Sequence, residues 1–117
     1  MKIYSAPSND LKAMTLPERC ANYGLAITAI VAEAKRKIAP KRIYLFGSRA
    51  RGNSRQLSDI DLAFIFDNHA NWSDFSSWVH EEAPTLLDVD LIDLDLCHES
   101  LREQIYHEGI IIYEREY

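Results

Sequence analysis

The stretch Leu45–Ala63, with the sequence LFGSRARGNSRQLSDIDLA, determines how the rest of the chain is interpreted. An apolar run ends at Gly47-Ser48, a basic turn region follows, and a second apolar run begins at Asp59-Ile60-Asp61. A strand that ends in small residues can present backbone N–H groups to an anion. Two aspartates spaced two residues apart at the start of a strand project to the same side. The stretch therefore predicts a divalent cation held by carboxylates beside a phosphate.

The segments around this stretch alternate between apolar runs and amphipathic periods, which predicts an α/β domain of the α+β type. An Ala-rich helix is expected from about Pro17 until Pro40 ends it. The order of the elements predicts a mixed sheet of about four strands flanked by helices. The expected strands are Ile43–Phe46, Ile60–Phe66, Leu86–Leu94 and Ile110–Tyr113, and the expected later helices are Trp72–Glu82 and Glu99–Glu108, the last one ended by Gly109.

The length of 117 residues fits one domain. We assign residues 17–117 to it and treat residues 1–16 as an N-terminal arm without an assigned role. With 47% hydrophobic and 26% charged residues, the composition is globular and excludes wholesale disorder. No apolar run approaches the length of a membrane span, and Cys20 and Cys97 lack metal-binding spacing. We therefore expect a cytoplasmic protein with free thiols and no membrane partner.

The net charge of −5 conceals a strong asymmetry along the chain. Between residues 33 and 55, eight Lys and Arg residues stand against a single Glu, a net charge of +7. Between residues 56 and 117, two Arg residues stand against fifteen Asp and Glu residues, a net charge of −13. A basic segment thus precedes an acidic one. This order is consistent with a cationic rim for phosphates beside carboxylates for a metal, or simply with a solvated helix end and an acidic surface.

Asp90 supplies a third carboxylate inside an otherwise apolar run, where a lone charge would be costly. If its strand neighbours the one that begins at Asp59 and Asp61, the three side chains can reach one point. Oxygen ligands of this kind suit hard divalent cations. The pair alone has a simpler explanation, since Asp59 could cap a turn. Asp93 and Asp95 have the opposite strand parity, and we expect them to be surface or capping residues.

The combination of Gly47-Ser48, ten residues, Asp59-x-Asp61 and a later Asp90 in a strand is more specific than any of its parts. It resembles the nucleotidyltransferase superfamily of DNA polymerase β, and in particular its minimal nucleotidyltransferase (MNT) branch. The resemblance covers roughly residues 39–114. It implies transfer of a nucleoside monophosphate from a nucleoside triphosphate, with release of pyrophosphate.

The resemblance also implies roles for individual residues. Gly47 and Ser48 would hold the β and γ phosphates, Asp59 and Asp61 would hold two Mg²⁺ ions, and Asp90 would complete the site and help to deprotonate the attacking hydroxyl. Two metals stabilise the attacking and leaving oxygens of such a transfer. The arginines of the basic turn region are further candidates for phosphate contacts, namely Arg49, Arg51 and Arg55.

Chains of this size resemble the MNT antitoxins, which occur with a separate HEPN protein. The resemblance implies that AMP passes from ATP to a tyrosine of a HEPN ribonuclease toxin and silences it. The acceptor would then come from a partner or a second copy, in a hetero- or homo-oligomer. Trp72, Phe75, Trp78, Tyr113 and Tyr117 could form such an interface, although the helical spacing of Trp72, Phe75 and Val79 is more typical of a core.

Two alternatives remain open at this point. The chain could transfer the nucleotide to a small molecule, as aminoglycoside nucleotidyltransferases do, although those enzymes usually need a second domain or a dimer. It could also be a non-catalytic binding module that blocks a toxin by occlusion. Polymerisation on a nucleic-acid template is disfavoured, because the C-terminal half is strongly acidic and no template-binding domain is present.

Overall fold

The computed structural model describes residues 23–47, 50, 59–85 and 87–116. The expected arm and the helix start near Pro17 lie outside the described residues, as do Cys20 and Tyr117. None of the described helices is long and apolar enough to cross a membrane. The elements are, in order, α2 (Tyr23–Lys37), β1 (Arg42–Phe46), β2 (Ile60–Ile65), the 3₁₀ turn η2 (His69–Asn71), α4 (Trp72–Glu82), β3 (Val89–Asp93), α5 (Glu99–Glu108) and β4 (Ile110–Glu114).

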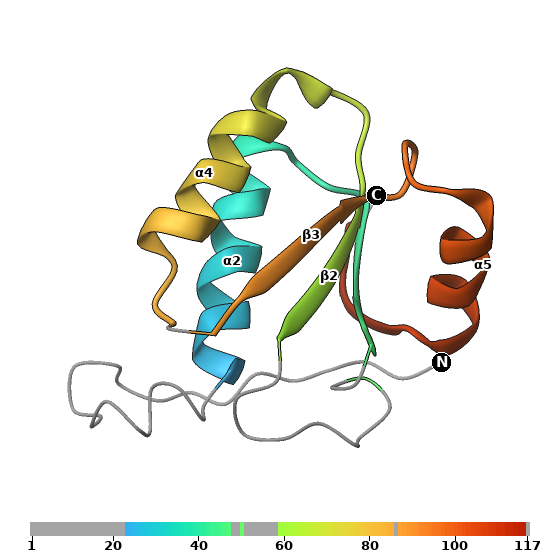
Figure 1. The fold of residues 1–117 in the computed structure, drawn as a ribbon. Coiled ribbons are helices and arrows are strands. Elements are labelled where there is room, and N and C mark those ends of the chain that lie inside the picture. Colours follow the sequence, from blue (N-terminus) through green and yellow to red (C-terminus); the bar gives the residue numbers. More distant parts are fainter. Residues whose placement is uncertain (1–22, 48–49, 51–58, 86, 117) are drawn as a thin grey trace.

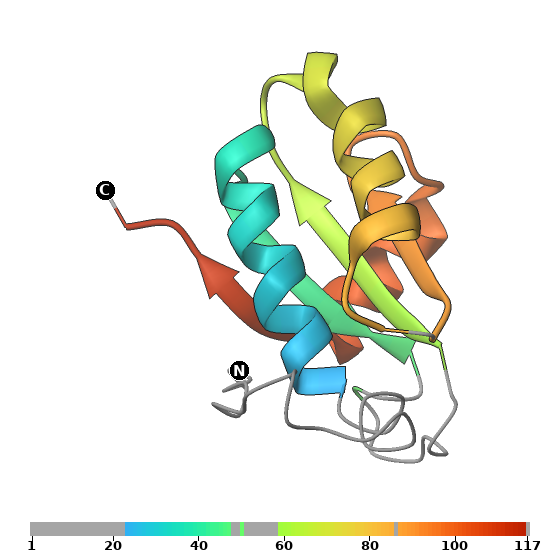
Figure 2. The ribbon, with the colours of Figure 1, turned by 90° about the vertical axis from the view of Figure 1, so that its left-hand side faces the viewer.

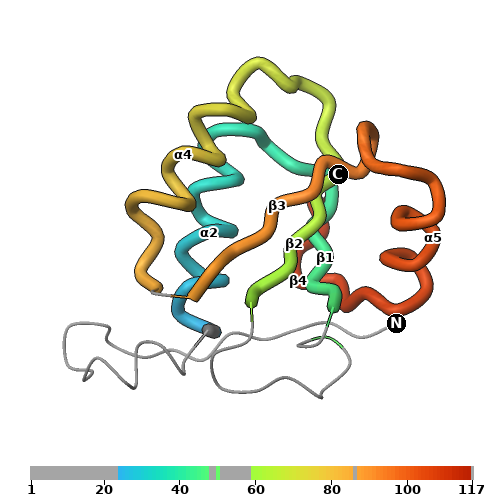
Figure 3. The backbone as a smooth tube through the Cα atoms, in the orientation of Figure 1, coloured from blue at the N-terminus to red at the C-terminus, as the bar shows by residue number. Residues whose placement is uncertain are grey.

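The four strands form one sheet in the order β3-β2-β1-β4 (Figure 3). β1 pairs antiparallel with both β2 and β4, and β2 pairs parallel with β3. The parallel pair is possible because η2 and α4 form the crossover between β2 and β3, and a parallel pair needs a connection of a dozen or more residues. The predicted mixed sheet of four strands flanked by helices is confirmed.

Helices cover both faces of the sheet (Figures 1 and 2). α2 and α4 lie side by side on one face, and α5 lies on the other. The alternation of strand side chains fits this layering, since Ile60, Leu62 and Phe64 of β2 join the core under α2 and α4, whereas Ala63 joins the smaller core under α5. The strand is buried on both faces, as its apolar sequence predicts. Only the start of β2 is therefore left to carry charged groups.

The amphipathic helix α4 confirms the core interpretation of its aromatic residues. Phe75 and Val79 are buried, and the Phe75 ring meets Phe64 edge-on with 5.3 Å between centroids. Trp72 and Trp78 are half-buried and pack against the same core. The spacing of Trp72, Phe75 and Val79 thus directs them into the protein. Phe75 is 0% exposed and cannot contribute to an external interface.

Helix α5 begins and ends where the sequence predicts, but Gly109 ends it for a different reason. His98 caps the N-terminus, where its Nδ1 accepts from the Ser100 N–H at 3.1 Å. Gly109 has an extended backbone with φ −69°, not the left-handed conformation common at helix ends. A Cβ there would lie 2.5 Å from the Ile105 carbonyl oxygen and 3.0 Å from Tyr44 Cδ1. Glycine is needed for this close approach of helix, strand and turn.

The third strand is shorter than the predicted Leu86–Leu94. β3 ends at Asp93, whose carbonyl accepts hydrogen bonds from the N–H groups of Leu96 and Cys97 at 3.1 and 3.0 Å. The chain therefore turns immediately after Asp93. Cys97, within this turn, is a free thiol, as expected. β3 also begins three residues after the predicted start, at Val89, whereas the Leu94 N–H still donates to the Phe64 carbonyl at 3.1 Å.

Candidate active site

Asp61 and Asp90 lie side by side at one end of the sheet. They are register partners in the parallel pair formed by β2 and β3. Adjacent strands are about 4.8 Å apart, and partners in register point to the same face. The strand starts are also joined by the Ile60 N–H, which donates to the Asp88 carbonyl at 2.9 Å. The expectation that the strand of Asp90 neighbours the strand of Asp61 is confirmed.

Asp59 adds a carboxylate at the same end of the sheet. It precedes β2 directly and is exposed, as is Asp90, while Asp61 is half-buried. Asp59 shares the parity of Asp61 and so belongs to the same side of the strand. Carboxylates at neighbouring positions repel one another, and a bound cation relieves this repulsion. An all-oxygen donor set of this kind fits Mg²⁺, which prefers carboxylate and water ligands.

Gly47 touches this cluster from β1. Phe46, the last residue of β1, is the register partner of Asp61, so the chain leaves the sheet next to that carboxylate. Gly47 has φ +72°, a left-handed conformation that glycine adopts without strain. A Cβ built on Gly47 would collide with Asp61 Oδ2. The turn after β1 therefore approaches the carboxylate as closely as the backbone allows, which requires glycine at this position.

The remaining predicted phosphate contacts cannot be placed in the same way. Ser48, Arg49, Arg51 and Arg55 lie outside the described residues. Ala50, between them, is described and packs half-buried against the larger core. The structure thus brings together Gly47, Asp61 and Asp90, with Asp59 directly before β2.

A second group of potential metal ligands lies at the other end of the sheet. His69, Asp93 and Asp95 each offer one ligand atom, and these atoms lie within 4.8 Å of one another. The expectation of surface or capping residues is confirmed, since Asp95 is exposed and Asp93, although buried, caps the turn with its Oδ1, which accepts from the Asp95 N–H at 3.0 Å. The alternation of side chains along β3 places Asp93 on the face covered by α2 and α4, and His69 of η2 lies on that same side. The sequence did not predict a role for His69, because its contact with Asp93 joins residues 24 positions apart and no nearby residue indicates it.

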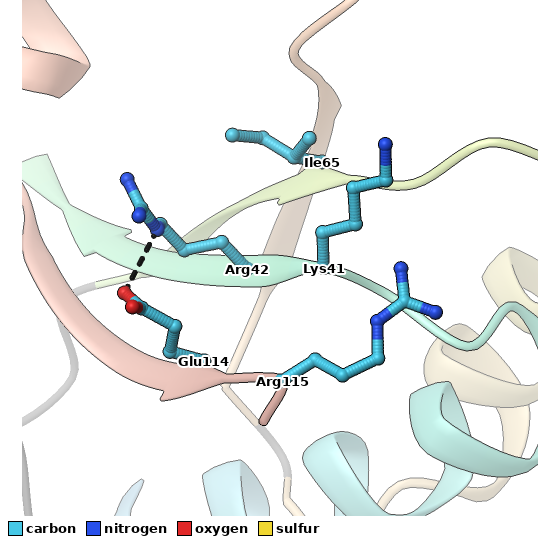
Figure 4. Close-up of a pocket in the computed structure, with 5 residues that line it drawn as sticks. All are labelled: Lys41, Arg42, Ile65, Glu114 and Arg115. Carbon is cyan, nitrogen blue, oxygen red and sulfur yellow. Dashed lines mark ion pairs between the residues drawn. The ribbon is translucent and has the colours of Figure 1, made fainter. Parts of the chain in front are cut away.

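A pocket of about 300 Å³ also lies away from Asp61 and Asp90 (Figure 4). It is lined by Lys41, Arg42, Ile65, Glu114 and Arg115, which come from the start of β1 and the ends of β2 and β4. Arg42 Nε pairs with Glu114 Oε2 at 3.0 Å, while Lys41 and Arg115 point to one side together. A hydrogen bond to the Tyr44 hydroxyl raises the pKa of the Arg42 guanidinium, with smaller support from Glu114. The pocket is a charged groove between strand ends and holds none of the predicted site residues.

The family model described as "Polymerase beta, Nucleotidyltransferase" matches residues 28–117. The matched range contains Gly47, all three predicted metal-binding aspartates and every strand of the sheet. The chain belongs to this nucleotidyltransferase family. Its resemblance to the minimal branch of that superfamily is also confirmed, because its relatives include an MntA protein and an MNT antitoxin.

Three relatives show what this nucleotidyltransferase is similar to. It is 31% identical over 91 residues to a Haemophilus influenzae protein named "Probable protein adenylyltransferase MntA", covering 75% of this chain and 80% of that protein. A crystal structure of a toxin–antitoxin with AMP-PNP matches with 29% identity and a TM-score of 0.57, covering 76% of this chain and 73% of the other. The structure of a tri-AMPylated Shewanella oneidensis HEPN toxin in complex with MNT antitoxin matches with 27% identity and a TM-score of 0.52, covering 78% and 71%.

Proposed function

We propose that this nucleotidyltransferase transfers AMP from ATP to a tyrosine hydroxyl of a partner HEPN toxin in the cytoplasm and acts as its antitoxin. The observation that carries the proposal is the register of Asp61 and Asp90. It places two carboxylates side by side near the starts of β2 and β3, where Gly47 also lies. The relatives support the choice of acceptor, because one is named a protein adenylyltransferase and another is the antitoxin in complex with an AMPylated HEPN toxin.

In this proposal the carboxylates divide the work by position. Asp59 and Asp61 would hold two Mg²⁺ ions, and Asp90 would complete the set and accept the proton of the attacking hydroxyl. Gly47 and Ser48 present backbone N–H groups to the β and γ phosphates, with Arg49 and Arg51 as weaker contacts to them. The metals, when bound, stabilise the charge that develops on the attacking and leaving oxygens.

The reaction proposed for this site is a single displacement at the α-phosphorus of ATP. The acceptor oxygen forms a bond to that phosphorus, the bond to the bridging oxygen of the β-phosphate breaks, and pyrophosphate leaves. The hydroxyl proton passes to a carboxylate. Residues 17–117 act as one catalytic domain in this scheme, and the acceptor reaches it as part of a hetero-oligomer with the toxin.

The test is transfer of label from [α-³²P]ATP in the presence of Mg²⁺ and the product of the neighbouring gene, which the proposal expects to be a HEPN toxin. We expect label on a toxin tyrosine, loss of toxin ribonuclease activity, and no label after Asp59→Asn plus Asp61→Asn. Asp74→Asn, an exposed carboxylate in the first turn of α4, is the matched control and should label normally. Mass spectrometry of the toxin identifies the modified residue.

Each alternative gives a distinct outcome in the same experiment. Label on an added aminoglycoside but not on the toxin would replace the proposal with small-molecule transfer. Toxin inhibition that survives the double substitution would show occlusion. Label on the toxin that persists in the double variant would contradict the assignment of the carboxylates.

A further inference from the structure

We propose that His69, Asp93 and Asp95 form a second cation site, for a divalent transition metal of the Zn²⁺ class, at the end of the sheet away from Asp61 and Asp90. The site joins η2, which follows β2, to the turn that follows β3. In Figure 1 these segments lie at the top of the molecule, whereas β2 and β3 begin at the bottom. The proposal does not rest on the proposed function.

The three ligand atoms are spaced as ligands of one metal. His69 Nε2 lies 2.9 Å from Asp93 Oδ2 and 3.7 Å from Asp95 Oδ2, and the atoms of the group are all within 4.8 Å. Two ligands that each lie about 2.0–2.2 Å from a Zn²⁺ ion are separated by roughly 3–4 Å. The Asp95 side chain is 57% exposed and can rotate to close the remaining distance.

The strongest single observation is the state of Asp93 Oδ2. The Asp93 residue is only 8% exposed, and no described residue donates a hydrogen bond to this buried oxygen. Its other oxygen, Oδ1, is already engaged by the Asp95 N–H. A buried carboxylate oxygen without a donor is destabilising, and a bound cation satisfies it. Asp93 Oδ2 is therefore buried beside His69, and no hydrogen bond from a described residue satisfies it.

His69 faces that oxygen as a metal ligand does. Its Nε2 is close to Asp93 Oδ2 but forms no hydrogen bond with it, so the oxygen lies to the side of the ring nitrogen's bonding direction. Two neighbouring ligands of one metal have this relation, because each points at the ion and not at the other. Both partners can keep their present positions when the ion enters.

The opposite side of the imidazole supports the same assignment. His69 Nδ1 lies 3.2 Å from the Asp67 carbonyl, which can only accept a hydrogen bond. Nδ1 is therefore the nitrogen that can donate to this carbonyl, and Nε2 is the nitrogen that faces the two carboxylates and would bind an ion. Metal-binding histidines commonly donate their other N–H to a carbonyl in this way. The Phe66 ring, 4.3 Å from the imidazole between centroids, helps to hold its orientation.

The ligand set and its surroundings select the kind of ion. One imidazole and two carboxylates suit Zn²⁺ and similar ions, whereas Mg²⁺ prefers oxygen ligands alone. The His69 side chain is 38% exposed, so an ion can enter from solvent and keep a water ligand. Asp90 and Asp93 are three residues apart in β3, about 10 Å, and face opposite sides of the sheet. The site is therefore structural and separate from the catalytic carboxylates.

The experiment uses the full chain with Asp59→Asn and Asp61→Asn, so that the catalytic carboxylates do not contribute. Calorimetric titration with Zn²⁺ should show one binding site per chain, with Mg²⁺ binding far more weakly. His69→Gln should weaken Zn²⁺ binding at least about tenfold. His107→Gln, which replaces an exposed histidine in α5, is the matched control and should leave binding unchanged.

Two further measurements separate a metal site from an ion pair. Zn²⁺ should raise the melting temperature of the His107→Gln variant but not that of His69→Gln or Asp95→Asn. Imidazole ¹⁵N resonances should show Nε2 of His69 changing on Zn²⁺ addition, with Nδ1 staying protonated. Absence of stoichiometric Zn²⁺ binding, equal binding by His69→Gln and His107→Gln, or an unaltered His69 resonance would each overturn the proposal in favour of an ion pair alone.

Discussion

The two ends of β3 treat a carboxylate in opposite ways. At the start of the strand, Asp90 is exposed and lies in register with Asp61, so that two like charges share one face. At the end, Asp93 is buried and closes a turn through the Asp95 N–H. Like charges side by side do not stabilise a sheet, whereas a buried capping carboxylate does. The start of β3 thus carries the pair for which we propose chemistry, whereas its end carries a carboxylate that closes a turn of the fold.

The largest effect is expected at the exposed end. Asp90→Asn keeps the shape of the side chain but removes a negative charge that the proposed reaction needs. We expect adenylyl transfer to fall at least about 100-fold, since metal-assisted charge stabilisation contributes several kcal/mol. The free energy of unfolding should be unchanged or slightly higher, because the repulsion with Asp61 is relieved.

Single-turnover labelling and denaturant unfolding of the same preparation measure the two quantities. Asp88→Asn is the matched control, because Asp88 is also exposed and lies two residues earlier in the chain. A variant that loses stability in proportion to its activity would show that Asp90 has a structural role. The contrast between the two ends of β3 would then disappear.

Gly47→Ala should give the next largest effect, and it changes both quantities. The left-handed backbone at φ +72° costs a non-glycine residue about 1–2 kcal/mol. The new Cβ must also displace the Asp61 carboxylate or the turn itself. We expect unfolding free energy to fall by about 1–2 kcal/mol and transfer activity to fall by about tenfold or more, as a misplaced catalytic group does.

The control for this variant is Gly109→Ala, since Gly109 is also closely packed but a Cβ there would meet Ile105 and Tyr44 and no carboxylate. It should lose stability without a comparable loss of activity per folded molecule. Equal activity losses in the two variants, once corrected for the folded fraction, would show that Gly47 does not position Asp61.

At the buried end, Asp93→Ala should affect the fold and spare the chemistry. The substitution removes the oxygen that accepts from the Asp95 N–H and leaves that donor without its partner. The expected loss in metal-free buffer is about 1–2 kcal/mol, the typical cost of losing a capping hydrogen bond. Transfer activity per folded molecule should remain within about twofold, because Asp93 faces away from Asp61.

Chemical denaturation in EDTA measures the loss, with Asp95→Ala as the matched control. The Asp95 side chain is mostly exposed and should contribute less than about 0.5 kcal/mol. An Asp93→Ala variant that is inactive but fully stable would contradict this prediction, because it would show that Asp93 serves the reaction and not the fold.

The sequence predicted most of the fold and the exposed half of this comparison. The boundaries of α4 and α5 follow from apolar spacing and terminal residues, and these signals are local. The meeting of Asp61 and Asp90 required one further assumption, that β2 and β3 are neighbours, and the helical crossover between them makes this the expected arrangement. Short-range patterns and one topological rule therefore suffice for this end of the sheet.

The buried surroundings of Asp93 at the end of β3 could not be predicted, because they depend on contacts between residues that are far apart in the sequence. The alternation of side chains along the strand correctly placed Asp93 on the face opposite Asp90. It could not show that His69 of η2 contacts Asp93 there. β3 also ends one residue earlier than the apolar run suggested, since the turn after Asp93 is closed by backbone hydrogen bonds that leave no sequence signature. The conformation of Gly109 was missed for a similar reason, since its close contact is with Tyr44 of another element.

The smallest effect is expected from Arg102→Met, which tests how the buried end is held from α5. The guanidinium of Arg102 donates to the carbonyl of Leu94 at 2.7 Å and to those of Asp95 and Cys97 at 3.3 Å. Methionine keeps much of the apolar stem but removes all three donors. We expect a loss of about 1 kcal/mol, since two of the hydrogen bonds are long and the side chain is partly exposed.

Arg36→Met is the matched control, because the Arg36 side chain is 72% exposed and its ion pair with Glu33, on the same helix, is worth less than about 1 kcal/mol. Hydrogen exchange should localise the Arg102→Met effect to the amides of the turn after β3, with those at the start of β2 and β3 unchanged. Faster exchange at both ends of β3 would show that the turn and the carboxylate cluster unfold as one unit. In that case the buried end supports the exposed end, and the two are coupled through the strand.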